Sequence, residues 1–276
     1  MKKLFVTDLD GTFLDPRAAV SEKSAKIINN FIKNGGHFTF ATARTAVSAS
    51  QIMKNVFVNV PCILMNGVSI YDLSEKRYIK NEYFSSKDSK KIAEIFSDCG
   101  VIPFMYKIEN EKLDTYYYDF NCRKMYDFFI MCKNDPNRSF YKCDSLIDAA
   151  DDMTIYFSVQ GSHDKLQKAA DILAKTNICS FAFYRDVYNT EIWFLEVFSK
   201  NASKSNGINF IKDYGGFEHI TCFGDNLNDI PMFEVCDKKI AVSNAKDEIK
   251  KAADEIIGSN TDDAVAVYIK KITERI

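Results

Sequence analysis

The chain has 276 residues, of which 46% are hydrophobic and 27% charged, and its formal net charge is -2 at pH 7. That length suits one large or two ordinary domains, and the near-neutral charge gives no reason to expect a nucleic acid or an anionic membrane as a partner. No apolar stretch reaches membrane-spanning length, and the N-terminus turns acidic by Asp8, which argues against a signal peptide. The eight cysteines are scattered without a C-x-x-C pair, so we expect free thiols in a reducing cytoplasm.

The first 82 residues predict an alternation of strands and helices. Strands are expected over 3–7, 37–42 and 61–65, and helices over 20–33 and 45–54. Ser21 is placed as the N-cap of the first helix, and Gly35-Gly36 as its stop. This order indicates parallel strands with right-handed crossovers, and their near-continuous apolar character fits a sheet that is covered on both faces.

The pattern changes near residue 83 and returns near residue 198. The middle segment predicts helices over 85–99, 122–132 and onward from Ser162, and strands over 101–106, 114–119, 153–159, 178–185 and 191–197. Strands at 219–223 and 239–242, with helices at 228–235, 245–254 and 262–273, then restore the α/β rhythm. We therefore predict an α/β protein: a Rossmann-like parallel-sheet core of residues 1–82 and 198–276, with an inserted α+β domain at 83–197.

Acidic and polar side chains follow the predicted strands of the core, where open parallel sheets bind their ligands. Four carboxylates at one sheet edge would repel each other unless a cation lies between them. Oxygen ligands of this kind suit Mg²⁺, which tends to share its ligand shell with a phosphate. Neither acidic segment matches the spacing of an EF-hand, and a structural magnesium site without catalysis remains an alternative. The side chains concerned are Asp8, Asp10, Thr12, Thr42, Asp225, Asn228 and Asp229.

Four segments together resemble the motifs of the haloacid dehalogenase superfamily. They are DLDGT at 8–12, TAR at 42–44, a lysine ahead of the last α/β segment, and GDNLND at 224–229. Their order, their spacing and the inserted block are similar to those of the Cof-type phosphatases with a type IIB cap, over essentially the whole chain. The resemblance implies an enzyme that uses Mg²⁺ to hydrolyse small phosphorylated metabolites through an aspartyl-phosphate.

Within that resemblance, sugar phosphates are the commonest substrate class, and flavin or pyridoxal phosphates are further candidates. A phosphomutase on the same core is the runner-up activity, and a regulatory module that binds magnesium without catalysis is the alternative from another class. The partner is expected to be a small phosphomonoester, with no nucleic acid and no membrane, and the chain is expected to be a monomer or a weak homo-oligomer.

The resemblance implies a role for each matching residue. Asp8 would be the nucleophile, and Asp10 the general acid and later the base, oriented by Thr12. Lys204 falls at the family's lysine position, whereas Lys200 is expected to face solvent. The residues expected to contact the phosphoryl group are Leu9, Thr42, Lys204 and Asn228, and those expected at the metal are Asp8, Asp10, Asp225 and Asp229.

Three further residues are expected to support the site. They are Arg44, which follows Ala43 where the family commonly has glycine, and the pair Asn66-Gly67, for which an ordinary turn is an equally good interpretation. Because the core motifs handle the phosphoryl group, the metal and the proton, we expect the inserted domain to choose the substrate. Candidate contacts there are Tyr116, Tyr118, Tyr184 and Arg185.

Overall fold

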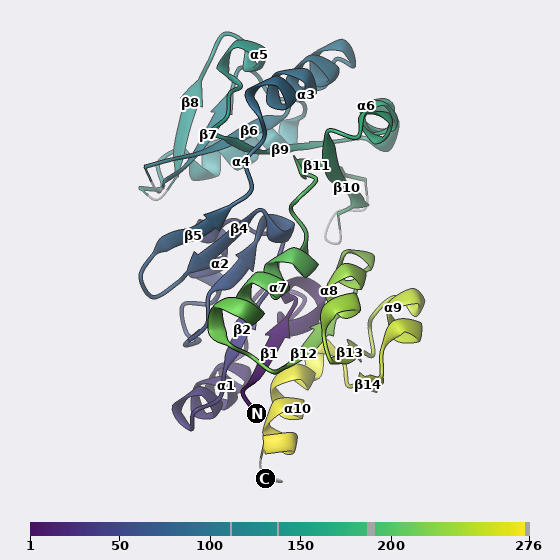
Figure 1. The fold of residues 1–276 in the computed structure, drawn as a ribbon. Coiled ribbons are helices and arrows are strands. Elements are labelled where there is room, and N and C mark those ends of the chain that lie inside the picture. Colours follow the sequence, from purple (N-terminus) through teal and green to yellow (C-terminus); the bar gives the residue numbers. More distant parts are fainter. Residues whose placement is uncertain (111, 137, 187–190, 274–276) are drawn as a thin grey trace. The chain divides into compact units, whose positions relative to one another are not determined.

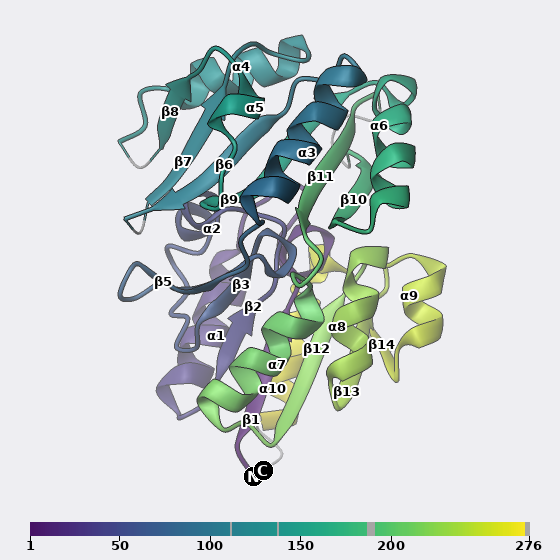
Figure 2. The ribbon, with the colours of Figure 1, turned by 45° about the horizontal axis from the view of Figure 1, so that its top comes forward.

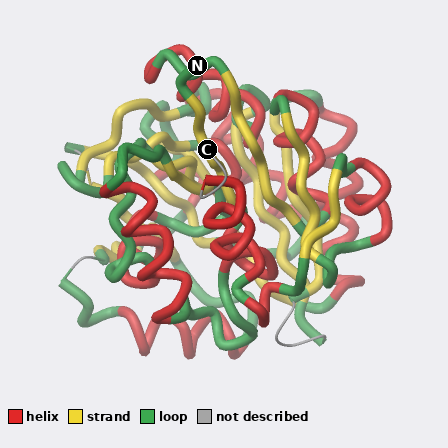
Figure 3. The backbone as a smooth tube through the Cα atoms, turned by 90° about the horizontal axis from the view of Figure 1, so that it is seen from below, coloured by secondary structure: helices red, strands yellow, loops and turns green. Residues whose placement is uncertain are grey.

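The structure is a computed structural model that describes residues 1–110, 112–136, 138–186 and 191–273 (Figure 1). It divides into two compact units, which we name the core unit (residues 1–80 and 203–276) and the insert unit (residues 81–202). The sequence placed the divisions at 82/83 and 197/198, and the roles of catalytic core and cap that it gave to the two parts stay predictions. The helices and strands of both units can be followed in Figure 3.

The core unit is built on a five-stranded parallel sheet with the order β14-β13-β12-β1-β2. β1 lies between β12 and β2, in register from Lys3↔His219 to Thr7↔Phe223 on one side. Its residues 4–7 are buried, as expected for a strand that is covered on both faces. The bounds are β1 Lys3–Thr7, β2 Phe38–Phe40, β12 His219–Gly224, β13 Lys238–Val242 and β14 Glu255–Ile257.

Helices cover both faces of this sheet (Figure 2). α1 packs on α10, and α7 packs on α8. Ser21 caps α1 by accepting a hydrogen bond from the Ser24 amide, and Ser203 caps α7 by accepting one from the Asn206 amide. The bounds are α1 Glu22–Lys33, α2 Ala46–Ile52, α7 Lys204–Gly215, α8 Ile230–Val235, α9 Asp247–Ala252 and α10 Ala264–Thr273.

One strand of the core has partners that the sequence did not predict. β3 (Cys62–Leu64) meets the parallel sheet only at a bridge between Ala41 and Ile63, and pairs antiparallel with β4 (Ser69–Asp72). With β5 (Arg77–Asn81) these strands form a separate three-stranded sheet. The predicted third strand at 61–65 is therefore present and parallel at this bridge, whereas its antiparallel pairing with β4, which follows from the tight turn at η2 (Met65–Gly67), was not predicted.

The insert unit contains a six-stranded sheet with the order β10-β11-β9-β6-β7-β8, as expected for an α+β domain. β6, β7, β9, β10 and β11 pair antiparallel, and β8 joins β7 in parallel. Its apolar core includes Phe96, Phe157 and Leu195. The strands are β6 Phe104–Glu109, β7 Lys112–Tyr117, β8 Ser139–Lys142, β9 Thr154–Gly161, β10 Cys179–Arg185 and β11 Trp193–Ser199, and the helices are α3 Ser86–Asp98, α4 Arg123–Cys132, α5 Leu146–Ala149 and α6 His163–Thr176.

The structure also bears on two predictions made from the composition, those on the cysteines and on membrane-spanning segments. All eight cysteines carry free thiols, as the sequence predicted. None of the helices in the described part of the chain combines the length and the apolar character that crossing a membrane requires.

Asp263 joins the N-terminal turn of α1 to the start of α10. Its carboxylate accepts hydrogen bonds from the hydroxyls of Ser21 and Ser24, the latter at 2.8 Å, and lies 3.2 Å from Lys23 Nζ. Burial by itself raises the pKa of Asp263, but these contacts outweigh it and lower the pKa. Because the folded-state pKa is depressed, the stabilisation is present above the unfolded value of about 3.9 and is lost as the pH falls through the folded pKa.

We therefore expect Asp263→Asn to lower the free energy of unfolding by about 1 kcal/mol at pH 7. The difference from the unsubstituted protein should shrink as the pH falls below the unfolded value of about 3.9 and disappear below the folded pKa of Asp263, where the carboxyl is protonated in both states. Denaturant unfolding at pH 7 and at the lowest pH at which the protein stays folded measures this difference. A penalty of equal size at both would show that the charge of Asp263 contributes nothing.

Candidate active site

The first loop of the site follows β1 and contains the turn η1 (Leu9–Phe13). The Asp8 amide donates to the Phe223 carbonyl at 2.9 Å, which fixes the main chain of Asp8 to the end of β12. Gly11 has φ +85°, and a Cβ there would lie 2.4 Å from Asp225 Oδ2. The glycine of the D-x-D-G-T segment is therefore required both by the turn and by the close approach of Asp225.

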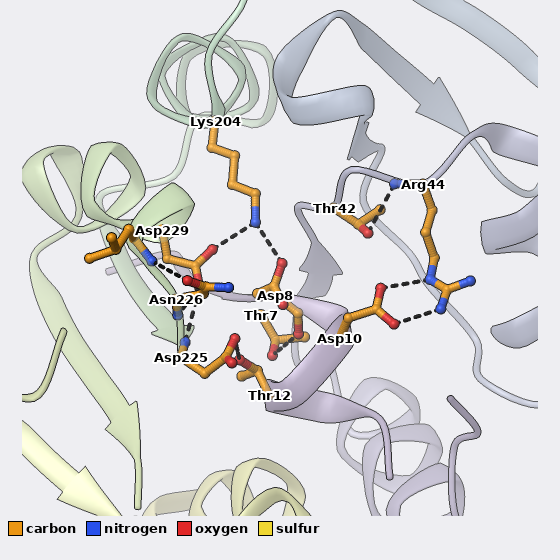
Figure 4. A network of polar contacts seen from close by, with 11 residues as sticks. Thr7, Asp8, Asp10, Thr12, Thr42, Arg44, Lys204, Asp225, Asn226 and Asp229 are labelled. Atoms are coloured by element: carbon orange, nitrogen blue, oxygen red, sulfur yellow. Dashed lines mark hydrogen bonds and ion pairs between the residues drawn. The ribbon is translucent and has the colours of Figure 1, made fainter. Parts of the chain in front are cut away.

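Lys204, at the first turn of α7, lies between two carboxylates (Figure 4). Its Nζ is 2.5 Å from Asp8 Oδ1 and 2.7 Å from Asp229 Oδ1. Lys204 is 2% exposed and Asp229 is fully buried, whereas Lys200 is exposed, as the sequence predicted. Such burial is rare for lysine unless the ammonium is paired, and here two buried carboxylates pair it.

The carboxyl groups around Lys204 outnumber its single positive charge. Asp8, Asp225 and Asp229 each offer an oxygen within 4.8 Å of the others, and they face a single ammonium. Burial raises the pKa of Asp8 well above its usual range, with Lys204 opposing and the two other carboxylates reinforcing the shift. Burial and Asp229 likewise raise the pKa of Asp225 to about 7. When all three carboxyls are ionised, two negative charges are uncompensated, so a divalent cation fits this set of oxygen donors.

Asp229 also shapes the loop after β12. Its Oδ2 accepts from the amides of Asp225 at 3.0 Å and Asn226 at 3.1 Å, and the Asn226 side chain accepts from Leu227 N at 2.8 Å. Together they form a capping box at η3 (Leu227–Asp229). Asn226 was not among the predicted site residues, although an N-cap asparagine three residues ahead of a carboxylate resembles the capping-box pattern.

Thr12 has a different partner from the expected one. Its hydroxyl donates to Asp225 Oδ1 at 3.0 Å, where an orienting contact to Asp10 was predicted. Asp10 is instead held by Arg44, with Nε 2.7 Å from Oδ2 and Nη2 2.5 Å from Oδ1. The bidentate guanidinium of Arg44 matches both oxygens of a carboxylate. Asp225 approaches Gly11 closely and accepts the hydrogen bond of the neighbouring Thr12 hydroxyl.

The second loop of the core carries Thr42 and Arg44 between β2 and α2. Thr42 is buried, and its hydroxyl accepts a hydrogen bond from the Arg44 amide at 3.2 Å. Arg44 Nη1 donates to Ser48 Oγ at 3.0 Å, a contact that was not predicted from the sequence. This loop therefore orients the arginine toward Asp10.

The remaining predicted residues lie around this group. The Leu9 side chain is fully buried in the core, so a contact of this residue with a ligand would have to come from its main chain. Asn228 is exposed in η3, beside Asp229. The Asn66 amide donates to the Thr42 carbonyl at 3.0 Å, and Gly67 packs on Ser203, so this turn touches both the second loop and the start of α7.

Gly67 sets the position of α7 through a close contact. It has φ +100°, and a Cβ there would lie 2.1 Å from the carbonyl oxygen of Ser203, the residue before Lys204. We expect Gly67→Ala to push Ser203 away, to shift Lys204 and to lower the melting temperature by several degrees, on the order of 1–3 kcal/mol of strain. The matched control is Gly100→Ala in the insert unit, where φ is also positive and no atom lies within 4 Å of the added Cβ. Equal thermal losses in the two variants would contradict this role for the Ser203 contact.

Comparison with known proteins agrees with this geometry. The family model described as haloacid dehalogenase-like hydrolase matches residues 5–269. A protein of Buchnera aphidicola subsp. Baizongia pistaciae that is named as a phosphatase is 28% identical over 99% of this chain and 98% of its own length. The pyridoxal phosphate phosphatase of Escherichia coli K12 is 21% identical over 97% of each chain.

Among solved structures, TM0651 from Thermotoga maritima matches all of this chain and 98% of its own, with 25% identity and a TM-score of 0.76. The fold and the site thus define a hydrolase with an α/β core and an inserted α+β unit. The chain belongs to the haloacid dehalogenase-like hydrolases. The expectations of this family, of this fold class and of a hydrolase are confirmed.

Proposed function

We propose that the protein is a Mg²⁺-dependent phosphatase that hydrolyses small phosphorylated metabolites through an aspartyl-phosphate on Asp8. The observation that carries this proposal is the buried Asp8 carboxylate, which lies against Lys204 within a group of three acids. A carboxylate so held has a defined direction of attack. The negative charge of its neighbours can be offset by a cation, beside which a phosphate can bind.

The proposed metal ligands come from two loops. Asp8 and Asp225 would hold Mg²⁺ directly, with the main-chain carbonyl of Asp10 as a further ligand, and Asp229 would orient Asp225 through its amide at 3.0 Å. When bound, Mg²⁺ neutralises charge on the phosphoryl oxygens, so that an anionic nucleophile can approach an anionic substrate. The raised pKa values of Asp8 and Asp225 support this proposal, because a cation would relieve the cost of ionising both carboxyls.

Side chains of the protein carry out the two steps of the proposed reaction. An Asp8 oxygen forms a bond to phosphorus while the bond to the leaving oxygen breaks, and Asp10 donates a proton to that oxygen. In the second half Asp10 accepts a proton from water, which attacks phosphorus and releases Asp8. In the structure both Asp10 oxygens accept from Arg44, so to act as the acid Asp10 must carry its proton on one oxygen while Arg44 keeps its contact with the other. Thr42, the Leu9 main chain, Lys204 and Asn228 are proposed to hold the phosphoryl oxygens.

For the substrate, we propose sugar phosphates, with other phosphorylated metabolites to be tested beside them because one relative is named for pyridoxal phosphate. The insert unit is proposed to select among them. In that unit Tyr184 stacks on Phe194 with ring centroids 5.4 Å apart, and Tyr116 stacks on Tyr141 at 5.3 Å, so both candidates have fixed orientations. We also propose a cytoplasmic location, which the eight free thiols support, and a monomer or weak homo-oligomer.

A phosphate-release screen over many phosphomonoesters tests the function. We expect release with Mg²⁺, loss of release in chelator and restoration by added Mg²⁺. Asp8→Asn protein purified in the same way controls for a contaminating phosphatase. Full activity in chelator, with metal content measured as zero, would refute the metal requirement. An isomerised phosphate ester in place of free phosphate would identify the mutase instead.

A further inference from the structure

Asn244 reaches the catalytic turn from the loop that follows β13. Its side-chain Nδ2 donates to the carbonyl oxygen of Gly11 at 2.7 Å. Gly11 lies within η1, between Asp10 and Thr12. The mechanism proposed above does not use Asn244, which is exposed.

Asn260, in the loop that follows β14, completes the arrangement. Its Nδ2 donates to the Leu14 carbonyl at 2.8 Å, and its main-chain amide donates to Asn244 Oδ1 at 3.0 Å. The two side chains are therefore joined, and they hold the turn at Gly11 and at Leu14, directly after η1. We name Asn244 and Asn260 the amide clasp.

The turn needs such contacts because it is irregular. Asp10 has ψ 117° and Gly11 has φ 85°, both outside helical values, so regular hydrogen bonds do not fix the peptide planes between them. Asp225 fixes the turn on one side by accepting a hydrogen bond from the Thr12 hydroxyl. The amide clasp fixes the carbonyl groups of Gly11 and Leu14.

From these contacts we infer that Asn244 and Asn260 are positioning residues, which fix the turn Leu9–Phe13 and thereby aim Asp8 and Asp10. They touch no reacting atom. The effect on catalysis rests on the proposed phosphatase function, whereas the hold on the turn does not. The hydrogen bonds of an exposed side chain such as Asn244, or of a half-buried one such as Asn260, contribute little to global stability. A small misplacement of reacting groups, in contrast, can cost about a hundredfold in rate.

The test compares Asn244→Ala and Asn260→Ala with a matched control, Asn59→Ala. Asn59 is also exposed and bridges two main-chain groups, because its Nδ2 donates to the Gly36 carbonyl at 2.8 Å and its Oδ1 accepts from the Phe38 amide at 3.1 Å. Its contacts lie at the start of β2, away from the carboxyl ends of the strands. Asn244→Asp separates the two roles, because it keeps the acceptor for Asn260 and loses the donor to Gly11.

Hydrogen exchange with Mg²⁺ present is the first readout, with the Leu14 amide, which donates to the Leu9 carbonyl at 2.9 Å, as its reporter. We expect faster exchange over residues 9–14 in all three clasp variants and unchanged exchange there in the control. In turnover of a phosphomonoester found by the screen, kcat should fall about tenfold to a hundredfold while KM changes by less than about threefold. Melting temperatures should stay close to that of the control.

If hydrogen exchange over residues 9–14 is as slow in the clasp variants as in Asn59→Ala, the inference is overturned. It is also overturned if kcat falls but exchange becomes faster throughout the core unit, because the substitution then loosens the whole unit. An unchanged kcat despite faster exchange would overturn the positioning role. If the unsubstituted protein hydrolyses no phosphomonoester, the proposed function fails, and the exchange rates alone decide whether the amide clasp holds the turn.

Discussion

Asp8→Asn is expected to lower turnover by roughly 10⁴-fold or more while the protein stays folded. The amide keeps the shape of the side chain but lacks the anionic oxygen that would attack phosphorus. Because burial raises the pKa of Asp8, the ionised group is costly in the folded state, and its neutral replacement should not lower the melting temperature. Steady-state phosphate release and thermal unfolding measure the two effects.

Asp15→Asn is the matched control for this substitution. Asp15 follows the same loop, but its carboxylate accepts from Arg17 and the Ala19 amide and has no contact with the acidic group. We expect its turnover to stay close to that of the unsubstituted protein. Near-normal turnover of pure Asp8→Asn protein, verified by mass, would rule out Asp8 as the nucleophile.

Lys204→Met is expected to have the second largest effect, with a loss of about 10²- to 10³-fold in kcat. The ammonium lies 2.5 Å from Asp8 and 2.7 Å from Asp229, and we propose that it sets the direction of the nucleophile and contacts the phosphoryl group. Methionine preserves much of the side-chain volume but leaves two buried carboxylates without this partner. The free energy of unfolding should therefore fall by about 3–5 kcal/mol when measured without metal.

Lys200→Met provides the control, because Lys200 is exposed and lies in the loop just before α7. It removes the same charge from the same region and should change neither turnover nor stability appreciably. If Lys204→Met lowers stability but keeps the turnover of Lys200→Met, Lys204 is only a structural cation and the proposed contact with the phosphoryl group is wrong.

The fold was largely predictable because its signals are local. Apolar runs marked β1 and β12, and Ser21 marked the start of α1. The partner of β3 was not predictable, since an apolar run of three residues does not indicate whether a parallel or an antiparallel neighbour covers it. That choice depends on the turn at Asn66 and Gly67, whose main-chain angles two residue names do not determine.

For the site, the sequence identified the acids but not their partners. The carboxyl ends of parallel strands meet at one edge, so Asp8 and Asp225 were expected together. The pairing of Asp10 with Arg44 and of Thr12 with Asp225 depends on side-chain directions across loops that are far apart in sequence. The amide clasp is of the same kind, because its members lie more than 230 residues beyond the turn they hold.

Trapping of the covalent intermediate tests the central proposal most directly. A ³²P-labelled phosphomonoester found by the screen would be mixed with the enzyme and Mg²⁺, quenched in acid within milliseconds and digested. We predict label on the peptide that contains Asp8, released by hydroxylamine as expected of an acyl phosphate and absent from Asp8→Asn protein. Label on another residue, or turnover without a labelled protein at any quench time while Asp8→Asn protein remains active, would contradict it.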